Sequence, residues 1–543
     1  MSPPEAYSIL SYWHATKPIY SCQFSPLNSA NNRFVTCGGD NKIKIWRFKN
    51  EQTEDFEKTI DKEKLNVLNS SLSLEDKLAY STLENESNKK SAGNLKQTSN
   101  NISLDASFSI KTHFQKAKDR VNNVEYISTL KGFSKPVNVA KYSKCGKYIA
   151  ACGDDGYILV WEKVPVDLLE KLKKESAHSS QMLQMGHLAS EIEKLLNPNK
   201  FPISYMGDYE DDEDEDMADI SAVKELYRVI RYFPVTSLSV SDHVEIYSLD
   251  WSADSRHLVV GYMNTYIKII DINNAQQPYI VVKKQHNDVV QGCCWDPRNE
   301  LVVSMGADRA MCVFKLKFSL QNRLMDLKLV NRIVKGEMDL SGKQENIFAQ
   351  VDLNFFRKLQ FSPDGNLLVL PYGIWKNDAN DEVNCVHIFH RANLIRGLNK
   401  PVATIPNLKK KCLCVSFNPN FYYRNNLSSS GGNLFALDHK MIFAVATEDE
   451  IMIYDTDNMK CLMTVKNLHY YTIYDLSWNA KGDKIIICSK DGFLSTIDLG
   501  SYSFGEIIAK TEIKEDLINV ETPIIELQSA SSAVVNVLSV RKK

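Results

Sequence analysis

The sequence predicts an all-β protein, a closed seven-bladed β-propeller with long loop insertions. Three observations predict this fold: a strand-like unit recurs seven times, a hairpin-like segment follows most copies, and one unpaired strand-like segment precedes the first copy. Repeats of about 40–45 residues are typical of propeller blades made of four strands. Because one blade cannot bury its apolar faces alone, we expect the copies to pack side by side in one ring.

The recurring unit is eight residues long and has an aromatic residue at its sixth position. Its alternation and its strand-forming residues are typical of a half-buried strand. Trp251 and Trp295 are 44 residues apart, and the other aromatic positions are 56–118 residues apart, so the other blades are expected to carry insertions. The seven copies are IYSCQFSP from Ile19, VNVAKYSK from Val137, IYSLDWSA from Ile246, VQGCCWDP from Val290, FRKLQFSP from Phe356, CLCVSFNP from Cys412 and IYDLSWNA from Ile473.

A second apolar run, a tight turn and a third apolar run follow the unit, as in RFVTCGGDNKIKIW and LVVSMGADRAMCVF. In four copies an Asp stands six residues before the end of the third run, and Asn264 takes this place in the third copy. Gly, Asn and Asp suit a hairpin that needs positive φ. Each copy is therefore expected to form a strand, a turn, a second strand, a hairpin and a third strand.

The two ends of the repeat region are expected to close the ring. After Ile473 the chain supplies three strands, which end near Leu499, and the segment Tyr7–Trp13 stands unpaired before the first unit. An unpaired sheet edge exposes its backbone N–H and C=O groups. We therefore predict that Tyr7–Trp13 is the fourth strand of blade seven, in a propeller of residues 1–500. The alternative fourth strand is the segment GEIIAKTEI from Gly505.

These units resemble WD40 repeats. Trp46 and Trp161 would take the place of the namesake Trp, although Arg47 and Glu162 replace the Asp that follows it. The resemblance implies a buried network that joins a His upstream of the inner strand, the hairpin Asp, a strand Thr or Ser and the Trp. The residues expected in such structural roles are His14, Thr36, Asp40, Trp46, Asp155, Trp161, His286, Ser304, Asp308 and Asp491.

The sequence contains no motif that favours catalysis, a cofactor or a metal site. G-x-x-x-x-G-K-[ST], G-x-S-x-G and H-E-x-x-H are absent, and no C-x-x-C pair exists. The adjacent Cys293 and Cys294 are interpreted as apolar packing residues of an inner strand. The same holds for the position three residues before the hairpin Asp, which carries Cys37, Cys152, Met305 and Cys488. We therefore expect a non-enzymatic protein without catalytic, cofactor-binding or metal-binding residues.

The composition is that of an ordinary globular protein of 543 residues, with 43% hydrophobic and 24% charged residues. The net charge of −2 gives no general attraction to nucleic acid or to an anionic membrane. Twelve cysteines are too sparse for a disulfide scaffold. Neither a secretory signal nor an apolar run of about 18 residues is visible. We expect a protein of the nucleus or cytosol that makes no membrane contact.

Two insertions and a tail interrupt or follow the repeats. Residues 50–120 are rich in Ser, Asn, Lys and Glu and are expected to be disordered. Residues 163–240 combine a helical pattern with an acidic run, interpreted either as a solvated linker or as a contact for a basic partner such as histones. Residues 501–543 form a C-terminal extension. The candidate histone contacts are Asp208, Glu210, Asp211, Asp212, Glu213, Asp214, Glu215 and Asp216, and the candidate partner contacts are Lys409, Lys410 and Lys411.

Longer stretches are similar to a narrower family, the WD40 subunit of chromatin assembly factor 1 in its fungal form. They include YWHATKPIYSCQFSP, FFRKLQFSPDGNLLVLPYGIWK, PVATIPNLKKKCLCVSFNPNFY and IFAVATEDEIMIYDTDNMKCLMTVKNLHYYTIYDLSW, which together span most of the ring. The two insertions and the tail match nothing recognisable, so what the resemblance implies applies to the ring alone.

The resemblance implies a nuclear, non-catalytic subunit of a histone chaperone that deposits histones H3 and H4 on replicated or repaired DNA. The implied partners are the large and small subunits of chromatin assembly factor 1, histones H3 and H4, and the anti-silencing histone chaperone. The Arg-rich motif that would recruit the last of these is not found after Leu499. Direct sequence-specific nucleic acid binding is not expected. The alternatives are a HIRA-type chaperone subunit and a WD40 substrate receptor of a ubiquitin ligase.

Overall fold

The computed structural model describes fifteen ranges of the chain. They are residues 5–9, 14–27, 32–49, 124–171, 224–234, 244–274, 278–319, 324–337, 344–350, 356–376, 381–424, 435, 437–500, 502–509 and 536–539. The chain divides into two units, Met1–Trp46 with Tyr126–Lys543, and Arg47–Glu125. The larger unit holds the body described below. The smaller unit is described only at 47–49 and 124–125, where strands of the first blade end and begin.

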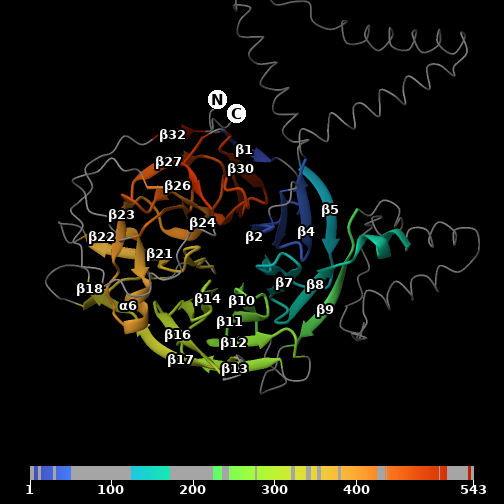
Figure 1. Cartoon of the computed structure of the whole chain (residues 1–543), viewed down its shortest axis with the longest axis horizontal. Coiled ribbons are helices and arrows are strands. Elements are labelled where there is room, and N and C mark those ends of the chain that lie inside the picture. The colour runs from blue at the N-terminus through green and yellow to red at the C-terminus, as the bar shows by residue number, and fades with distance from the viewer. Residues whose placement is uncertain are drawn as a thin grey trace, which may run out of the picture. The chain divides into compact units, whose positions relative to one another are not determined.

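Seven sheets, each built on four antiparallel strands, stand around a common centre, which confirms the predicted seven-bladed propeller (Figure 1). Blade one has β2 (Ile19–Phe24), β3 (Arg33–Gly38), β4 (Ile43–Phe48) and β5 (Val124–Leu130). Blade two has β6 (Val137–Tyr142), β7 (Tyr148–Gly153), β8 (Ile158–Lys163) and β9 (Tyr227–Phe233). Blade three has β10 (Ile246–Trp251), β11 (His257–Tyr262), β12 (Tyr266–Asp271) and β13 (Tyr279–Lys284).

The remaining blades repeat this order. Blade four has β14 (Val290–Trp295), β15 (Leu301–Gly306), β16 (Met311–Phe318) and β17 (Leu324–Ile333). Blade five has β20 (Gln360–Phe361), β21 (Leu367–Lys376), β22 (Glu382–His390) and β23 (Ala403–Leu408). Blade six has β24 (Cys412–Tyr422), β25 (Lys440–Thr447), β26 (Glu450–Asp455) and β27 (Cys461–Lys466). Blade seven has β28 (Ile473–Trp478), β29 (Lys484–Ser489) and β30 (Leu494–Asp498).

The fourth strand of blade seven comes from the N-terminal segment. Strand β1 (Glu5–Ile9) pairs antiparallel with β30, with Ala6 opposite Ile497 and Ile9 opposite Leu494. Its bounds start two residues before the predicted Tyr7–Trp13, and residues 10–13 lie outside the described part. The segment from Gly505 does not fill this place. Its short strand β31 (Ile507–Ile508) pairs with β24, and β32 (Asn536–Ser539) pairs parallel with β27, so both extend blade six.

The predicted insertion at 163–240 is wrong in its extent, because it contains a strand of the ring. Strand β9 lies inside it and pairs antiparallel with β8. Its sequence, YRVIRYF, has no turn signal of its own after the acidic run, so no local pattern separates this strand from the insertion. Residues 166–171 are helical, at the start of the predicted helical pattern. Residues 50–120 and 208–216 lie outside the described residues. Two further elements are the hairpin of β18 (Lys335–Glu337) with β19 (Gln344–Asn346) and the helix α6 (Arg391–Arg396).

The repeated unit forms the inner strand of each blade and the turn that follows it. The hydroxyl or carboxylate at its seventh position accepts backbone N–H groups of the turn: Ser252 from His257 at 2.8 Å and Ser362 from Leu367 at 2.9 Å. The core lies between neighbouring blades, where side chains of adjacent sheets interdigitate. For example, Trp251 of blade three packs in one cluster with Val160 of blade two. This arrangement explains why the sixth position is aromatic.

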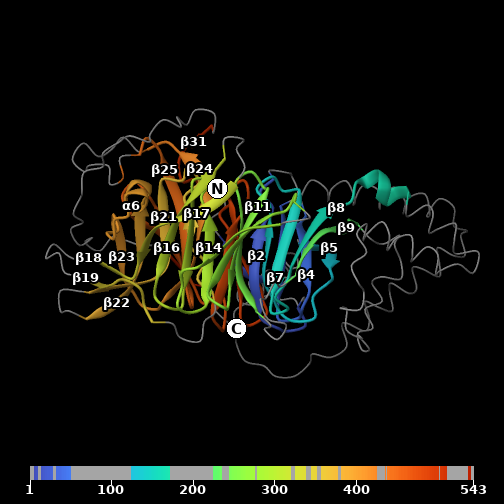
Figure 2. The same cartoon turned by 90° about the horizontal axis from the view of Figure 1, so that it is seen from below.

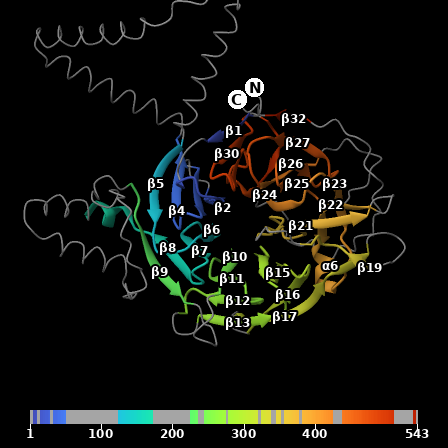
Figure 3. The same cartoon turned by 180° about the vertical axis from the view of Figure 1, so that it is seen from behind.

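Because all inner strands run in the same direction, the ring has two different faces. We call the side where the inner strands begin the start face and the side where they end the end face. Helix α6 and β31 lie toward the end face, and the β18–β19 hairpin lies toward the start face (Figure 2). Strands β2, β6, β10 and β24 lie nearest to the centre (Figure 3). The chain leaves blade two after β8 at the end face. The insertion that follows β8 therefore begins at this face.

Candidate interaction site around the central channel

Blade one contains the polar network that the sequence predicts. The His14 ring lies between two partners, with Nε2 2.8 Å from Thr36 Oγ1 and Nδ1 2.8 Å from Asp40 Oδ1. Trp46 Nε1 donates to the same Thr36 oxygen at 2.8 Å. All four side chains are nearly inaccessible to solvent. The network ties the loop before β2 to the hairpin between β3 and β4, a structural role.

Blade four repeats the network with an added arginine. His286 Nε2 lies 2.8 Å from Ser304 Oγ, and His286 Nδ1 lies 3.0 Å from Asp308 Oδ1. Arg332 Nη2 donates to Asp308 Oδ2 at 2.6 Å. Burial favours the neutral form of Asp308, but the His286 ring, a backbone N–H and Arg332 outweigh it and lower the pKa of this carboxyl to about 2.

Replacing Asp308 with asparagine should therefore reduce stability mainly where the carboxylate is ionised. The depressed pKa means that its contribution is complete above the unfolded value of about 3.9 and is lost as the pH falls toward about 2. We expect Asp308→Asn to cost about 1–3 kcal/mol at pH 7 and to flatten the loss of stability below pH 4. Chemical unfolding between pH 2 and 7 measures both. Asp167→Asn, at an exposed residue, is the control, and equal pH profiles for the two variants would contradict the prediction.

Blade two has no histidine at the corresponding place. Phe133 stands four residues before Val137, where His286 stands four before Val290, and it packs at 5.1 Å on Tyr157 and 6.1 Å on Trp161, between ring centroids. Asp155 accepts backbone N–H groups of Ser134 at 2.7 Å and of Lys135 at 3.0 Å. Aromatic packing thus replaces the ring-nitrogen contacts here.

Blade seven has a histidine that the sequence reasoning missed. His469 Nδ1 lies 3.1 Å from Asp491 Oδ2, and the backbone N–H of Tyr470 donates to the same oxygen at 3.0 Å. His469 stands four residues before Ile473, the offset found in blade four, so this spacing could have identified it. Ile487 occupies the position of Thr36 and Ser304.

The inner strands surround a channel that contains a cavity of about 710 Å³. Four charged side chains from four blades form part of its wall, namely Lys141, Asp250, Lys358 and Asp475. The eighth residues of all seven units also line it: Pro26, Lys144, Ala253, Pro297, Pro363, Pro419 and Ala480. The second residue of each repeated unit lies near the start face. None of these second residues is among the described residues that line the cavity. The cavity therefore reaches the end face and stops short of the start face.

Two ion pairs, each between a half-buried lysine and a buried aspartate, connect inner strands across the channel wall. Lys141 Nζ lies 3.0 Å from Asp250 Oδ1, between blades two and three. Lys358 Nζ lies 2.6 Å from Asp475 Oδ2 and donates to the backbone oxygen of Tyr20 at 2.8 Å, so it joins blades five, seven and one. Burial lowers the pKa of Lys358, but the Asp475 carboxylate outweighs burial and raises it above the ordinary value. Lys358 thus crosses the channel below the start face.

These pairs were not predicted, although their residues were visible. Lys141 and Asp250 occupy the fifth position of their units, and Lys358 and Asp475 occupy the third. Charged residues inside short strands between apolar neighbours are the signal that could have found them, because such charges must be paired when buried.

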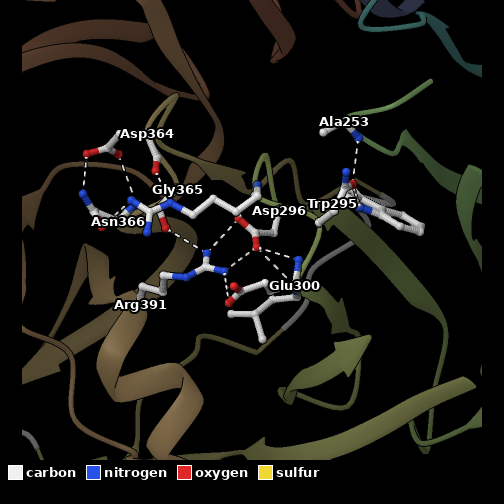
Figure 4. Close-up of polar contacts among 11 residues, drawn as sticks. Ala253, Trp295, Asp296, Glu300, Asp364, Gly365, Asn366 and Arg391 are labelled. Atoms are coloured by element: carbon white, nitrogen blue, oxygen red, sulfur yellow. Dashed lines mark hydrogen bonds and ion pairs between the residues drawn. The ribbon is translucent and has the colours of Figure 1, made fainter. Parts of the chain in front are cut away.

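A third polar cluster lies at the end face between blades four and five (Figure 4). Arg391, the first residue of α6, holds both carboxylate oxygens of Asp296, at 2.8 and 2.7 Å, and reaches Glu300 at 2.7 Å. Asp296 is completely buried and also accepts the backbone N–H groups of Glu300 and Leu301. Arg298 donates to the backbone oxygen of Asp364 at 2.7 Å. The cluster fixes the turn after β14 against blade five.

A comparison with protein families gives a match over more than half of the chain. Residues 218–503 match the CAF1B/HIR1 β-propeller domain, and residues 8–47 and 124–162 match the WD domain, G-beta repeat. The chain belongs to the CAF1B/HIR1 β-propeller family. The two matches together cover all seven blades of this CAF1B/HIR1 propeller.

Several curated proteins are similar to this CAF1B/HIR1 propeller. The B subunit of chromatin assembly factor 1 from Saccharomyces cerevisiae is 26% identical, over 99% of this chain and 96% of the relative. The same subunit from Schizosaccharomyces pombe is 25% identical over 92% of this chain and 87% of the relative, and that from Gallus gallus is 26% identical over 70% and 59%. Protein HIR2 of Debaryomyces hansenii is 21% identical over 50% of this chain and 25% of the relative.

The predicted charged contacts lie on the start face of the CAF1B/HIR1 propeller or outside the described residues. Lys409, Lys410 and Lys411 form the loop between β23 and β24. Lys410 Nζ lies 3.1 Å from Asp449 Oδ2, and Lys411 Nζ donates to the backbone oxygen of Gln350 at 3.3 Å. Lys409 and Lys410 are exposed. The acidic candidates at 208–216 are not among the described residues.

The adjacent cysteines of blade four are packing residues. Cys293 and Cys294 are both buried, and burial raises the pKa of the Cys293 thiol to about 12. Within the part of the chain that the structure describes, no group of three or more His, Cys, Asp or Glu side chains could hold a metal ion. None of the described helices has the length and apolar character needed to span a membrane.

Proposed function

We propose that the chain is a non-catalytic scaffold subunit of a nuclear chromatin assembly factor 1 complex. With the large and small subunits it would deposit histones H3 and H4 on DNA during replication and repair. The observation that carries the proposal is the similarity to the Saccharomyces cerevisiae relative, which extends over nearly the whole of both chains. The described geometry supports a scaffold: blades are joined by buried polar networks, and two faces remain available for partners.

The acidic run is the proposed contact for histones. Eight of the nine residues from Asp208 to Asp216 are acidic, so the run would attract strongly basic proteins and repel nucleic acid. The exposed Lys409 and Lys410, with Lys411, are the proposed contact for a partner subunit. The anti-silencing histone chaperone is a further proposed partner, through a surface other than the Arg-rich motif that the tail lacks.

Affinity purification of the full chain from dividing cells tests the proposal directly. We expect mass spectrometry to identify the large and small assembly-factor subunits together with H3 and H4. Recovery of a ubiquitin-ligase scaffold without these proteins would reject the proposal in favour of a substrate receptor. Recovery of HIR-type partners alone would favour the second candidate, which the weaker similarity to Protein HIR2 supports.

Removing residues 208–216 tests the histone contact separately. We expect the deletion to weaken H3–H4 binding at 150 mM salt by about tenfold and to reduce its salt dependence, because fewer charges pair with Lys and Arg. Titration of labelled H3–H4 at three salt concentrations measures both quantities. A loop of equal length made of Ser and Gly is the matched replacement. An unchanged affinity and salt slope would reject the acidic contact.

A further inference from the structure

Four aromatic side chains gather where the channel meets the start face. Tyr20, Tyr247 and Tyr474 are the second residues of their units in blades one, three and seven, and Phe356 precedes β20 in blade five. The ring centroids of Tyr20 and Phe356 are 5.5 Å apart, those of Tyr20 and Tyr474 are 5.7 Å apart, and those of Phe356 and Tyr474 are 5.8 Å apart. Tyr247 lies 6.3 Å from Phe356. We call these four residues the aromatic mouth.

The aromatic mouth is closed from below and partly open above. Lys358 Nζ lies 5.6 Å from the ring centroid of Phe356 and crosses the channel beneath it, so the mouth does not continue into the cavity. Tyr20 and Tyr474 are half-buried, whereas Phe356 and Tyr247 are buried. Four rings from four blades thus make a shallow aromatic floor on the start face. Lys358 already shows that a cation is tolerated against this floor.

Two carboxylates lie beside the aromatic mouth. Asp154 accepts a hydrogen bond from Asn138 Nδ2 at 2.7 Å, and Asn138 also donates to the backbone oxygen of Ile246 at 3.0 Å, which holds Asp154 against blade three. Glu245 accepts the Tyr247 hydroxyl. Burial raises the pKa of Asp154, and the nearby Glu245 carboxylate raises it further; the Asn138 amide and the Lys135 cation lower it but do not outweigh burial. Among the described residues, no Lys, Arg or His forms an ion pair with either carboxylate.

The combination fits a cation supplied by a partner. Aromatic faces and carboxylates without an ion-pair partner both attract ammonium and guanidinium groups, and both repel phosphates and acidic side chains. A positive side chain placed over the Tyr20 and Tyr474 rings would relieve the repulsion between Asp154 and Glu245. Nucleic acid does not fit this surface, because its phosphates would meet the two carboxylates.

We propose that the aromatic mouth, with Asp154 and Glu245, binds a lysine or arginine side chain of a basic polypeptide segment that docks on the start face. This inference rests on the proposed function in one respect, namely that the chain works among strongly basic partners. It adds a second contact for such partners, separate from the acidic run and formed by the ring itself.

Peptide binding to the full chain with residues 208–216 replaced by Ser and Gly tests the inference, because the acidic run would itself attract basic peptides. The probes are three fluorescein-labelled 15-residue peptides that share a Gly/Ser sequence, with four arginines, four lysines or four citrullines. We expect the arginine and lysine peptides to bind, with fluorescence anisotropy rising at micromolar to millimolar protein, and the citrulline peptide to bind at least fivefold more weakly. Equal binding of all three peptides, or no binding by any of them, would overturn the inference.

Matched variants locate the binding site. Glu245→Gln removes one charge without changing size, and Tyr474→Leu removes one aromatic face but keeps an apolar side chain. Each should weaken the arginine peptide at least fivefold, while Glu170→Gln, at an exposed residue on the end-face side, should leave its affinity unchanged. Circular dichroism shows whether Tyr474→Leu is folded. If Tyr474→Leu is unfolded, the result for Glu245→Gln still tests the inference. An affinity of Glu245→Gln equal to that of the wild type would overturn the inference.

A parallel purification separates this inference from the proposed function. Glu245→Gln should still recover the large assembly-factor subunit, since that association does not depend on one carboxylate at the aromatic mouth. If the wild type recovers the subunits but the peptides do not bind, the mouth proposal fails and the proposed function stands. If the peptides bind at the mouth but no assembly-factor subunit or histone is recovered, the proposed function fails and the basic-segment site stands.

Discussion

Replacing Arg391 with methionine should cost about 3–5 kcal/mol of unfolding free energy, because it leaves a buried carboxylate without its cation. Asp296 is completely buried, and the Arg391 guanidinium contacts both of its oxygens (Figure 4). The backbone N–H groups that Asp296 also accepts cannot neutralise its charge. Guanidinium chloride unfolding followed by tryptophan fluorescence measures the loss.

Two further variants show whether charge or geometry is responsible. Arg391→Lys keeps the charge but cannot contact both oxygens in one plane, so its cost should lie between that of the wild type and of Arg391→Met. Glu300→Gln should cost less than about 1 kcal/mol, because the Glu300 side chain is 46% exposed. If Arg391→Met unfolds within 1 kcal/mol of the wild type, the Asp296 charge is compensated by other groups and the interpretation is wrong.

Replacing Lys358 with methionine is expected to have an effect of similar size, about 3–5 kcal/mol. Lys358 is the one described residue whose side chain joins blades five, seven and one across the channel, through Asp475 and the backbone oxygen of Tyr20. Its loss leaves Asp475 with Ser21 Oγ at 3.0 Å and backbone contacts but without a cation. Thermal unfolding at neutral pH measures the change.

Lys144→Met is the matched control for this variant. Lys144 also lines the cavity but is exposed at the end face, so its replacement should change stability by less than about 0.5 kcal/mol. Combining Lys358→Met with Asp475→Asn should recover part of the loss, since no unpaired charge then remains. A double variant that is no more stable than Lys358→Met alone would assign the loss to packing of the lysine stem.

The inner strands and hairpins could be predicted because their signals are local. The aromatic sixth residue, the turn after it and the hairpin Asp stand at fixed offsets, and these offsets identify a blade even when long loops separate the copies. The His14 and His286 networks are implied by the resemblance to WD40 repeats rather than by these offsets. The N-terminal strand could be predicted from a general requirement, namely that sheet edges should not remain unpaired.

The outer strands and the channel charges could not be predicted in this way. An outer strand such as β9 is mostly half-buried and carries two arginines, so its pattern resembles that of the surrounding insertion. Lys358 and Asp475 are 117 residues apart, and only ring closure brings them together. The same holds for Arg391 and Asp296, because no local sequence pattern indicates which two buried charged residues form an ion pair.

The pairing of β1 with β30 has a consequence for synthesis on the ribosome. Strand β1 is translated before the other described strands, and its partner β30 follows nearly 490 residues later. At about 5–20 residues per second, this delay lasts roughly 25–100 s. During that time the backbone N–H and C=O groups of β1 are unpaired and can bind other chains. The need of the nascent chain for chaperones should therefore depend on β1 more than on any other described strand.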